Sequence, residues 1–320
     1  MSEVIDRSLE EVVNEILRSK KEKNAIILAH NYQRGEVQDI ADFVGDSLAL
    51  SIRAKETNAN VIVFCGVHFM AETASILNPD KKVLLPDLEA GCSLSDSITV
   101  EELREWKSKH PNAVVVSYVN TTAEVKSESD YCCTSSNALK VVQSIPEDKE
   151  ILFLPDMFLG SYVANVTGRK IHIWPGECHV HANVRPSDIE KIRNEHPSAD
   201  FLIHPECGCT TSCLYYAKNK DINTNKTYFL STEGMVNFVK NSTDNEFVVA
   251  TEIGVIHRMK KFKPDASYYP VSENMICEYM KRITLDKVLD SLKHEKYEIK
   301  VPEEIRQRAL IPIERMLNIR

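Results

Sequence analysis

The sequence predicts an α/β protein built from three homologous three-layer αβα domains, each with a small parallel sheet, arranged about a pseudo-threefold axis. Apolar runs of strand length alternate with amphipathic helical patterns, which is typical of parallel sheets joined by right-handed crossovers. Capped helices, polar strand ends and cysteines also recur three times in the same order. The alternative is one large doubly wound sheet whose segments resemble one another by chance. The predicted domains are 1–92, with the C-terminal segment 278–320 packing on it, 93–178 and 179–277.

The first copy opens with a capped helix. Ser8 and Glu11 form a capping box, and apolar residues recur at helical spacing over 6–24. The elements expected next are a strand over 25–33, a helical stretch over 35–58 interrupted near Gly45, a strand over 60–66, a helix over 67–78 and a strand over 81–87. The loop after this last strand carries Cys92.

The second copy repeats this order. Thr99 and Glu102 form its capping box. The expected elements are a helix over 99–111, a strand over 113–121, a helix over 135–147, a strand over 150–156, a helix over 157–168 and a strand over 169–175. The loop that follows carries Cys178.

The third copy is longer because of an inserted loop over 207–227. Ser187 and Glu190 are expected to cap its first helix. The expected elements are a helix over 185–197, a strand over 199–207, a helix over 231–242, a strand over 246–252, a helix over 253–262 and a strand over 266–271. The Cys277 loop follows, and the segment 284–294 resembles a fourth entry helix with Lys287 at the acidic position of the box.

Composition narrows the class of protein. With 43% apolar and 27% charged residues the chain reads as an ordinary soluble globular protein, and a formal net charge of -8 without a basic stripe argues against nucleic acid as a partner. We find no apolar run of membrane-spanning length and no signal-peptide pattern at the N-terminus, so we expect a cytoplasmic protein. Nine cysteines without a secretory context favour metal or redox chemistry over a disulfide framework.

Polar residues follow the first strand of each copy. Ligands of open α/β sheets bind beyond the carboxyl ends of the strands, so these residues are candidates for a shared site. The three-residue strand ends that carry them are His30-Asn31-Tyr32 in the first copy, Tyr118-Val119-Asn120 in the second and His204-Pro205-Glu206 in the third. The next helix of each copy is expected to start with a hydroxyl: Ser47, Ser135, and Ser231 or Thr232. Free N–H groups and hydroxyls at helix starts suit carboxylates and phosphates, although each hydroxyl can also be a plain N-cap.

Cys92, Cys178 and Cys277 occupy equivalent loops at strand carboxyl ends. Three sulfur ligands suit an iron–sulfur cluster or zinc, and three buried thiols are the alternative. A three-thiolate [4Fe–4S] cluster would leave one iron free to act on substrate as a Lewis acid. His179 and His181 flank the Cys178 loop, and one of them is a candidate for the site.

A compact motif competes for the metal. Cys207, Cys209 and Cys213 look like a metal or redox knuckle, but they belong to one copy only. Glu206 is adjacent, so Cys207 or Cys209 is a candidate for the rim of the site. The absence of glycine-rich phosphate-binding and dinucleotide-binding motifs argues against a nucleotide cofactor.

The chain resembles the quinolinate synthase family over most of its length. The segments that carry the resemblance are ILAHNYQRGEVQDIADFVGDSLALS, PDLEAGCSLSD, SYVNTTAEVK, YCCTSSNA, WPGECHVH, IHPEC, STEGM, ATEIGVIHRM and SENMIC, in the expected order. The resemblance implies three α/β domains with the site on their common axis and a [4Fe–4S] cluster on Cys92, Cys178 and Cys277. It implies condensation of iminoaspartate with dihydroxyacetone phosphate to quinolinate, with loss of phosphate and two waters. Iminoaspartate would come from L-aspartate oxidase or an aspartate dehydrogenase.

The same resemblance assigns roles to the polar residues. Tyr32 and Glu206 match acid–base positions, and His204 matches a residue that holds substrate and is included in the catalytic group. The residues matching substrate-binding positions are His30, Ser47, Tyr118, Asn120, Ser135, His181, His204, Glu206 and Thr232. Two alternatives stay open: another iron–sulfur hydro-lyase, and a metal-binding redox sensor or scaffold that uses the Cys207–Cys213 loop. The assembly is open as well, with a homodimer as one option.

Overall fold

The computed structural model describes residues 8–210 and 226–319. Three four-stranded parallel sheets organise these residues. A helix lies between each pair of consecutive strands within a sheet except β9 and β10, whose connection falls largely outside the described ranges. The three sheets draw on separate, consecutive parts of the chain.

The first repeat contains the N-terminal helix and the first sheet. Its elements are α1 (Leu9–Glu22), β1 (Ala25–His30), α2 (Gly35–Ile40), β2 (Phe43–Gly45), α3 (Ser47–Glu56), β3 (Val61–Cys65), α4 (His68–Leu77) and β4 (Lys82–Leu84). A short 3₁₀ turn, η1 (Ser95–Ser97), follows the Cys92 loop.

The second repeat has the same order of elements. They are α5 (Val100–Lys109), β5 (Val114–Tyr118), α6 (Ala123–Ser127), β6 (Tyr131–Cys133), α7 (Ala138–Ser144), β7 (Ile151–Leu154), α8 (Met157–Thr167) and β8 (Ile171–Ile173). A single helical turn, α9 (His179–Ala182), begins directly after Cys178.

The third repeat and the C-terminal helices complete the chain. The elements are α10 (Pro186–Glu195), β9 (Asp200–Ile203), β10 (Thr227–Phe229), α12 (Thr232–Asn241), β11 (Glu246–Ala250), α13 (Val255–Phe262), β12 (Ser267–Pro270), α14 (Glu278–Lys281), α15 (Leu285–His294) and α16 (Glu303–Asn318). The turn α14 begins directly after Cys277, as α9 does after Cys178.

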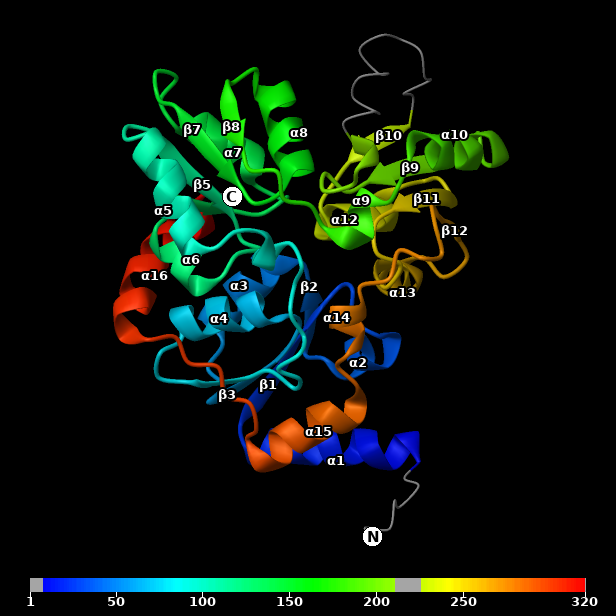
Figure 1. Cartoon of the computed structure of the whole chain (residues 1–320). Coiled ribbons are helices and arrows are strands. Elements are labelled where there is room, and N and C mark those ends of the chain that lie inside the picture. Colours follow the sequence, from blue (N-terminus) through cyan, green and yellow to red (C-terminus); the bar gives the residue numbers. More distant parts are fainter. Residues whose placement is uncertain (1–7, 211–225, 320) are drawn as a thin grey trace.

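Every sheet has the same topology. The strand orders are β2-β1-β3-β4, β6-β5-β7-β8 and β10-β9-β11-β12, and all pairings are parallel (Figure 1). In each sheet the first strand of the repeat is internal and the strand that follows it lies at an edge. This repetition confirms the predicted fold class of three αβα units. The pseudo-threefold axis and the domain boundaries at 92, 178 and 277 stay predictions.

The sequence-based prediction missed the edge strands. The stretch 35–58, expected as one interrupted helix, contains α2, the edge strand β2 and α3. Aspartates explain the break: Asp42 accepts a hydrogen bond from the Ile27 N–H in β1 (2.8 Å), and Asp46 caps α3 at Ala49. Such side-chain bonds to the backbone compete with a continuous helix. The second repeat has an equivalent hydrogen bond, in which Asp130, just ahead of β6, accepts the Val115 N–H (2.8 Å).

The entry helices begin largely as predicted. The capping boxes Ser8–Glu11 and Thr99–Glu102 are confirmed. The box expected from Ser187 and Glu190 is wrong, because α10 begins at Pro186 with Arg185 as N-cap, and Asp188 accepts the Arg185 N–H (2.9 Å). Proline is favoured in the first turn, where its missing N–H costs no helical hydrogen bond.

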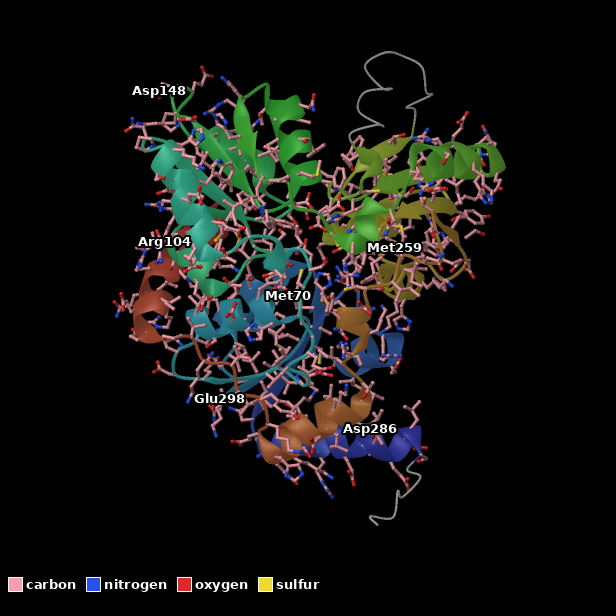
Figure 2. The ribbon with its side chains drawn as sticks, in the orientation of Figure 1. Met70, Arg104, Asp148, Met259, Asp286 and Glu298 are labelled. Atoms are coloured by element: carbon pink, nitrogen blue, oxygen red, sulfur yellow. The ribbon has the colours of Figure 1, made fainter. Side chains whose placement is uncertain are left out.

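The C-terminal segment packs on more than the first repeat. The helix α15 packs against α1 and β3, as expected for 278–320. The helix α16 instead packs against α6 and β6 of the second repeat as well as α4, and Figure 1 shows it (red) beside α4 and α6. One apolar core consequently runs through the first two repeats and both C-terminal helices, whereas the third repeat has cores of its own. Met70 lies inside the molecule, while Asp148 and Glu298 project outward (Figure 2). Within the described ranges, no helix combines the length and apolar character needed to cross a bilayer.

Glu128, the C-cap of α6, holds α16 by charge. Burial alone would raise the pKa of Glu128, but hydrogen bonds from Arg308, Lys107 and Arg104 lower that pKa to about 2. The folded-state pKa lies below the unfolded value, so the stabilisation is present above about pH 4.5 and disappears as the pH falls toward 2.

We therefore expect Glu128→Gln to lower the free energy of unfolding by about 1 kcal/mol at neutral pH, and by less at pH 3. Urea denaturation at the two pH values measures this difference. Glu105→Gln, which removes an exposed i,i+4 pair with Lys109, is the control and should change little. An equal loss at both pH values would contradict the assignment.

Candidate active site

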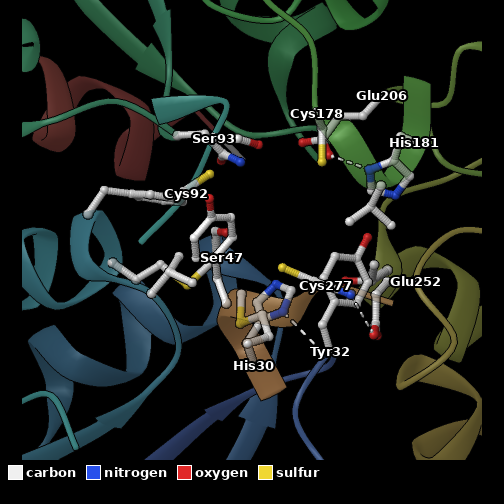
Figure 3. Close-up of a pocket in the computed structure, with 18 of the residues that line it drawn as sticks. His30, Tyr32, Ser47, Cys92, Ser93, Cys178, His181, Glu206, Glu252 and Cys277 are labelled. Atoms are coloured by element: carbon white, nitrogen blue, oxygen red, sulfur yellow. Dashed lines mark hydrogen bonds and ion pairs between the residues drawn. The ribbon is translucent and has the colours of Figure 1, made fainter. Parts of the chain in front are cut away.

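The carboxyl ends of the three sheets meet at one cavity (Figure 3). Each repeat contributes two residues to the lining of this cavity from the end of its first strand, and the two residues are two positions apart. These pairs are His30 and Tyr32, Tyr118 and Asn120, and His204 and Glu206. The chain turns directly after these strands, and the residue between the members of each pair does not line the cavity. The predicted polar strand ends therefore converge, as the carboxyl-end rule requires.

Two cavity histidines are held in the same way. The His30 Nδ1 accepts the Tyr32 N–H (3.1 Å), and the His204 Nδ1 accepts the Glu206 N–H (3.4 Å). Burial lowers the pKa of His30 to about 3 and the pKa of His204 well below its usual range, so both rings are neutral at pH 7. A neutral ring that accepts at Nδ1 carries its proton on Nε2. Each ring therefore offers an Nε2–H donor, and that of His204 lies 3.2 Å from the Ser135 hydroxyl.

The predicted hydroxyls also line the cavity. Ser47 is the first residue of α3, and Thr232 is the first residue of α12. Ser135 lines the cavity too, but the prediction that it starts a helix is wrong, because α7 begins at Ala138 with Asn137 as N-cap. Ser231 is a plain N-cap whose hydroxyl accepts the Gly234 N–H.

Asn31 and Arg258 orient the hydroxyl of Thr232. The Asn31 side-chain amide donates to the Thr232 Oγ1 (2.9 Å), and Arg258 donates to the Asn31 Oδ1 (2.8 Å). Arg258 also pairs with Glu233.

Fixed dipoles supply the polarity of the cavity wall. Among the described residues that line it there is no lysine or arginine. Its donors are hydroxyls, neutral imidazoles and the amino ends of α3 and α12, whose free N–H groups favour anions. Such a wall can bind carboxylates or phosphate by hydrogen bonds without a fixed cation.

Three cysteines surround the same cavity. Cys92, Cys178 and Cys277 all line it, and their sulfur atoms are directed into it (Figure 3). Burial raises the pKa of Cys92 to about 12 and the pKa of Cys277 to about 11, and it raises the pKa of Cys178 well above its usual value. Each thiolate would also raise the pKa of a neighbouring thiol, which shows that the three sulfur atoms are close enough to interact.

The backbone after each cysteine favours a thiolate. Cys178 and Cys277 are the N-caps of α9 and α14, and η1 follows Cys92 closely. Backbone N–H groups in these turns lie near the sulfur atoms and lower the thiol pKa, partly offsetting burial, although neither Cys178 nor Cys277 forms a side-chain cap hydrogen bond; these donors belong to Leu94, Ser95, Val180, Tyr279 and Met280. Buried thiols with such donors suit a bound cationic metal centre, because the metal removes the cost of three adjacent thiolates.

A second donor set overlaps the first. Ligand atoms of Cys178, His181 and Glu206 all lie within 4.8 Å of one another. The His181 Nδ1 is 3.3 Å from Glu206 Oε2, yet burial lowers the pKa of His181 to about 3, so this contact is not an ion pair at neutral pH. The cavity therefore offers either a three-thiol site or a mixed Cys–His–Glu site.

Glu206 is suited to proton transfer. Burial raises its pKa to about 7, and the Tyr118 hydroxyl moderates the increase. Its Oε1 has no hydrogen-bond partner, and the same holds for the buried Asn120 Oδ1 and His181 Nδ1. Unpartnered buried polar atoms are costly, so their concentration in one cavity wall indicates a place for a polar ligand.

A hydroxyl links Tyr32 to His181. The Thr251 Oγ1 is hydrogen-bonded to the Tyr32 hydroxyl and lies 3.0 Å from the His181 Nε2. Burial raises the pKa of Tyr32 well above its usual range, so the phenol is protonated at neutral pH. The chain Tyr32–Thr251–His181 ends beside Glu206, so groups able to exchange protons lie in one connected series.

The quinolinate synthetase A protein family model matches residues 14–318. The chain belongs to the quinolinate synthase family. It is 56% identical to a quinolinate synthase of Thermus thermophilus over 97% of this chain and 98% of the relative. Identity is 55% to the quinolinate synthase of Pyrobaculum aerophilum (95% and 98% covered) and 49% to quinolinate synthase 2 of Methanosarcina acetivorans (96% of each covered).

Every residue that the family resemblance matched to a catalytic, substrate-binding or cluster position lines the one cavity. They are His30, Tyr32, Ser47, Cys92, Tyr118, Asn120, Ser135, Cys178, His181, His204, Glu206, Thr232 and Cys277. Sequence reasoning missed Thr251, Ser93 and Glu252 and left His179 undecided. Glu252 lines the cavity, as does the His179–Ser93 pair, which is joined by a 2.7 Å contact. Thr251 directly follows β11, so the carboxyl-end rule, had it also been applied to this strand, would have found it.

The remaining cysteines lie elsewhere. Cys207 and Cys209 are buried in an apolar core of the third repeat and do not line the cavity, so their expected place at its rim is wrong. Cys213 lies outside the described residues. Cys65, Cys132 and Cys133 are buried.

We expect Thr251→Val to slow quinolinate formation by about 100-fold while changing KM much less, because the variant removes the hydroxyl that orients Tyr32 and His181. Steady-state kinetics of the active protein measures both constants. Thr73→Val is the matched control, since the Thr73 hydroxyl is buried on α4 and bonds the Phe69 carbonyl. Similar rates for the two variants would refute the role of Thr251.

Proposed function

We propose that this chain is a quinolinate synthase that condenses iminoaspartate with dihydroxyacetone phosphate, releases phosphate and two waters, and closes the pyridine ring of quinolinate. Cys92, Cys178 and Cys277 would hold a [4Fe–4S] cluster. The observation that carries the proposal is that three thiols, two acid–base candidates and a set of neutral donors from all three repeats line one cavity. Membership of the quinolinate synthase family supplies the reaction.

The donor set fits a cluster with one open iron. The cavity has three thiols and, among the described residues that line it, no fourth. Thiolates are the usual ligands of iron–sulfur clusters, and three of them leave one iron available to a substrate oxygen. When bound, the cluster would supply a Lewis acid that polarises a carbonyl or assists departure of a hydroxyl.

The neutral donors fit the charges of the two substrates. Iminoaspartate carries two carboxylates, and dihydroxyacetone phosphate carries a phosphate. The Nε2–H groups of His30 and His204 can donate to them without a charge of their own. Ser47 and Thr232 add hydroxyls at helix starts, and Ser135 adds one beside His204. Tyr118 and Asn120 supply a phenol and an amide from the second repeat.

Proton transfers would fall to Tyr32 and Glu206. Imine–enamine shifts and dehydrations need groups that both accept and release protons near pH 7. Burial brings the pKa of Glu206 to about 7, which suits it to both tasks. Tyr32 starts as a neutral phenol held by Thr251, so it can donate, and a proton lost from it can be replaced along the hydrogen bonds to His181.

The substrates imply a place in metabolism. Iminoaspartate is an unstable imine, so an enzyme that oxidises aspartate has to supply it, either an L-aspartate oxidase or an aspartate dehydrogenase. A cytoplasmic location and a homodimer stay predictions.

Substitution of the cysteines distinguishes the three-thiol site from the site made by Cys178, His181 and Glu206. We expect Cys92→Ala, Cys178→Ala and Cys277→Ala each to abolish the cluster, measured as iron, sulfide and visible absorbance after anaerobic purification. A single metal on Cys178, His181 and Glu206 would instead survive loss of Cys92 or Cys277, and that result would overturn the cluster assignment. Cys209→Ala and Cys213→Ala are controls that should keep the cluster, and loss of iron only in these two would move the site to the compact motif.

Glu206→Gln tests the chemistry apart from the cluster. The amide keeps the shape of the side chain but cannot accept a proton, so we expect wild-type iron and sulfide content with turnover lower by about 100-fold or more. Glu273→Gln on an exposed loop is the control. Wild-type turnover in Glu206→Gln would remove Glu206 from the mechanism.

A further inference from the structure

A second group of metal-ligand type lies outside the cavity, in the second repeat. His110 is the C-cap of α5, Glu150 directly precedes β7, and His172 is the middle residue of β8. Glu150 therefore sits at the amino end of its strand, whereas the cavity lies at the carboxyl ends. Asp148, two residues before Glu150, projects at the outer end of the repeat, far from Met70 in the cavity wall (Figure 2).

The three side chains converge on one point. The His110 Nδ1 and the His172 Nε2 each lie 2.7 Å from the Glu150 Oε1. The ligand atoms of all three residues are within 4.8 Å of one another, and the two imidazole rings are 4.5 Å apart between centroids. Ligand atoms of a tetrahedral zinc site with bonds of about 2.0 Å are separated by roughly 3.3 Å, so small side-chain shifts suffice to admit a zinc ion.

The surroundings of Glu150 leave its carboxylate available to a metal cation. Within residues 8–210 and 226–319, the ion pairs of Glu150 are with these two imidazoles only, so no lysine or arginine competes for its carboxylate. Trp106 packs edge-on against His110 and also contacts Trp174, which fixes the ring of His110 from behind. The side chains of His172 and Glu150 are 33% and 38% exposed, so solvent reaches the group and a water can be a fourth ligand.

The ligand types select the metal. Two imidazoles and one carboxylate suit zinc, whereas calcium and magnesium prefer all-oxygen sites. Without a metal, both imidazoles donate to the shared carboxylate oxygen. Each neutral ring can move its proton to its other nitrogen, which frees the Nδ1 of His110 and the Nε2 of His172 to bind a metal.

We propose that His110, Glu150 and His172 form a zinc site, separate from the active-site cavity, that links the end of α5 to β7 and β8. The proposal does not depend on the reaction. A bound ion would join three segments that are distant in sequence, so it would stabilise the folded second repeat increasingly as the free zinc concentration rises.

The test is equilibrium dialysis of the cluster-loaded protein against buffered free Zn²⁺, followed by elemental analysis for zinc and iron. We expect the wild type to hold one zinc per chain in addition to its iron. His110→Ala and His172→Ala should weaken zinc binding by about 100-fold or more, since loss of an outer-shell partner alone costs about 10–100-fold. Iron content and the rate of quinolinate formation should be unchanged, which separates failure of this site from failure of the active site.

His294→Ala is the matched control. His294 is exposed and pairs with Asp290 as a simple i,i+4 contact, so its loss should leave zinc binding unchanged. Zinc should also raise the melting temperature of the wild type and of His294→Ala but not of His110→Ala. X-ray absorption at the zinc edge should show nitrogen and oxygen ligands only. Sulfur ligands, no zinc in the wild type, or equal zinc binding in the wild type and His110→Ala would each overturn the proposal.

Discussion

The parallel pairing of strands in each sheet is the constraint on which the site depends. Because every pairing in each sheet is parallel, every strand of a sheet ends at the same edge, and the three such edges face one cavity. A polar residue at the end of β1, β5 or β9 is thereby placed by the backbone ladder of its sheet. The cysteine loops follow the last strands of the three sheets, β4, β8 and β12, so the same edges also bring three thiols together.

The donor groups that line the buried cavity are uncharged. The described lining residues include neither lysine nor arginine, and burial keeps His30, His181 and His204 uncharged. Hydrogen bonds from residues two positions later fix the orientation of two of these rings, so their donors need no reorganisation when an anion arrives. Glu206 can exchange protons in such a wall, because burial moves its pKa into the range where a carboxyl both gives and takes a proton.

The sequence predicted those features that recur and missed those that are short or long-range. Internal strands such as 25–33 and 113–121 are continuous apolar runs, and the cysteines stand at matching positions, so both could be read from the chain. Edge strands of three residues, such as β2 and β6, are too short to show a period of two, and aspartate bonds to the backbone mark them only once the neighbouring strand is known. Thr251 was missed because its importance depends on meeting Tyr32 and His181, which lie far from it in the sequence. The compact Cys207–Cys209 pair was the reverse case, since it looked functional in sequence but its side chains belong to a core.

We propose that Cys92, Cys178 and Cys277 hold a cluster whose fourth iron faces the substrates. Mössbauer spectroscopy of the ⁵⁷Fe-reconstituted protein, recorded with and without dihydroxyacetone phosphate, distinguishes that iron from the other three. We expect the signal of one iron of the [4Fe–4S] cluster to change on addition of the substrate while the other three keep their thiolate-like parameters. Four irons that all remain unchanged, or a spectrum of mononuclear iron, would contradict it.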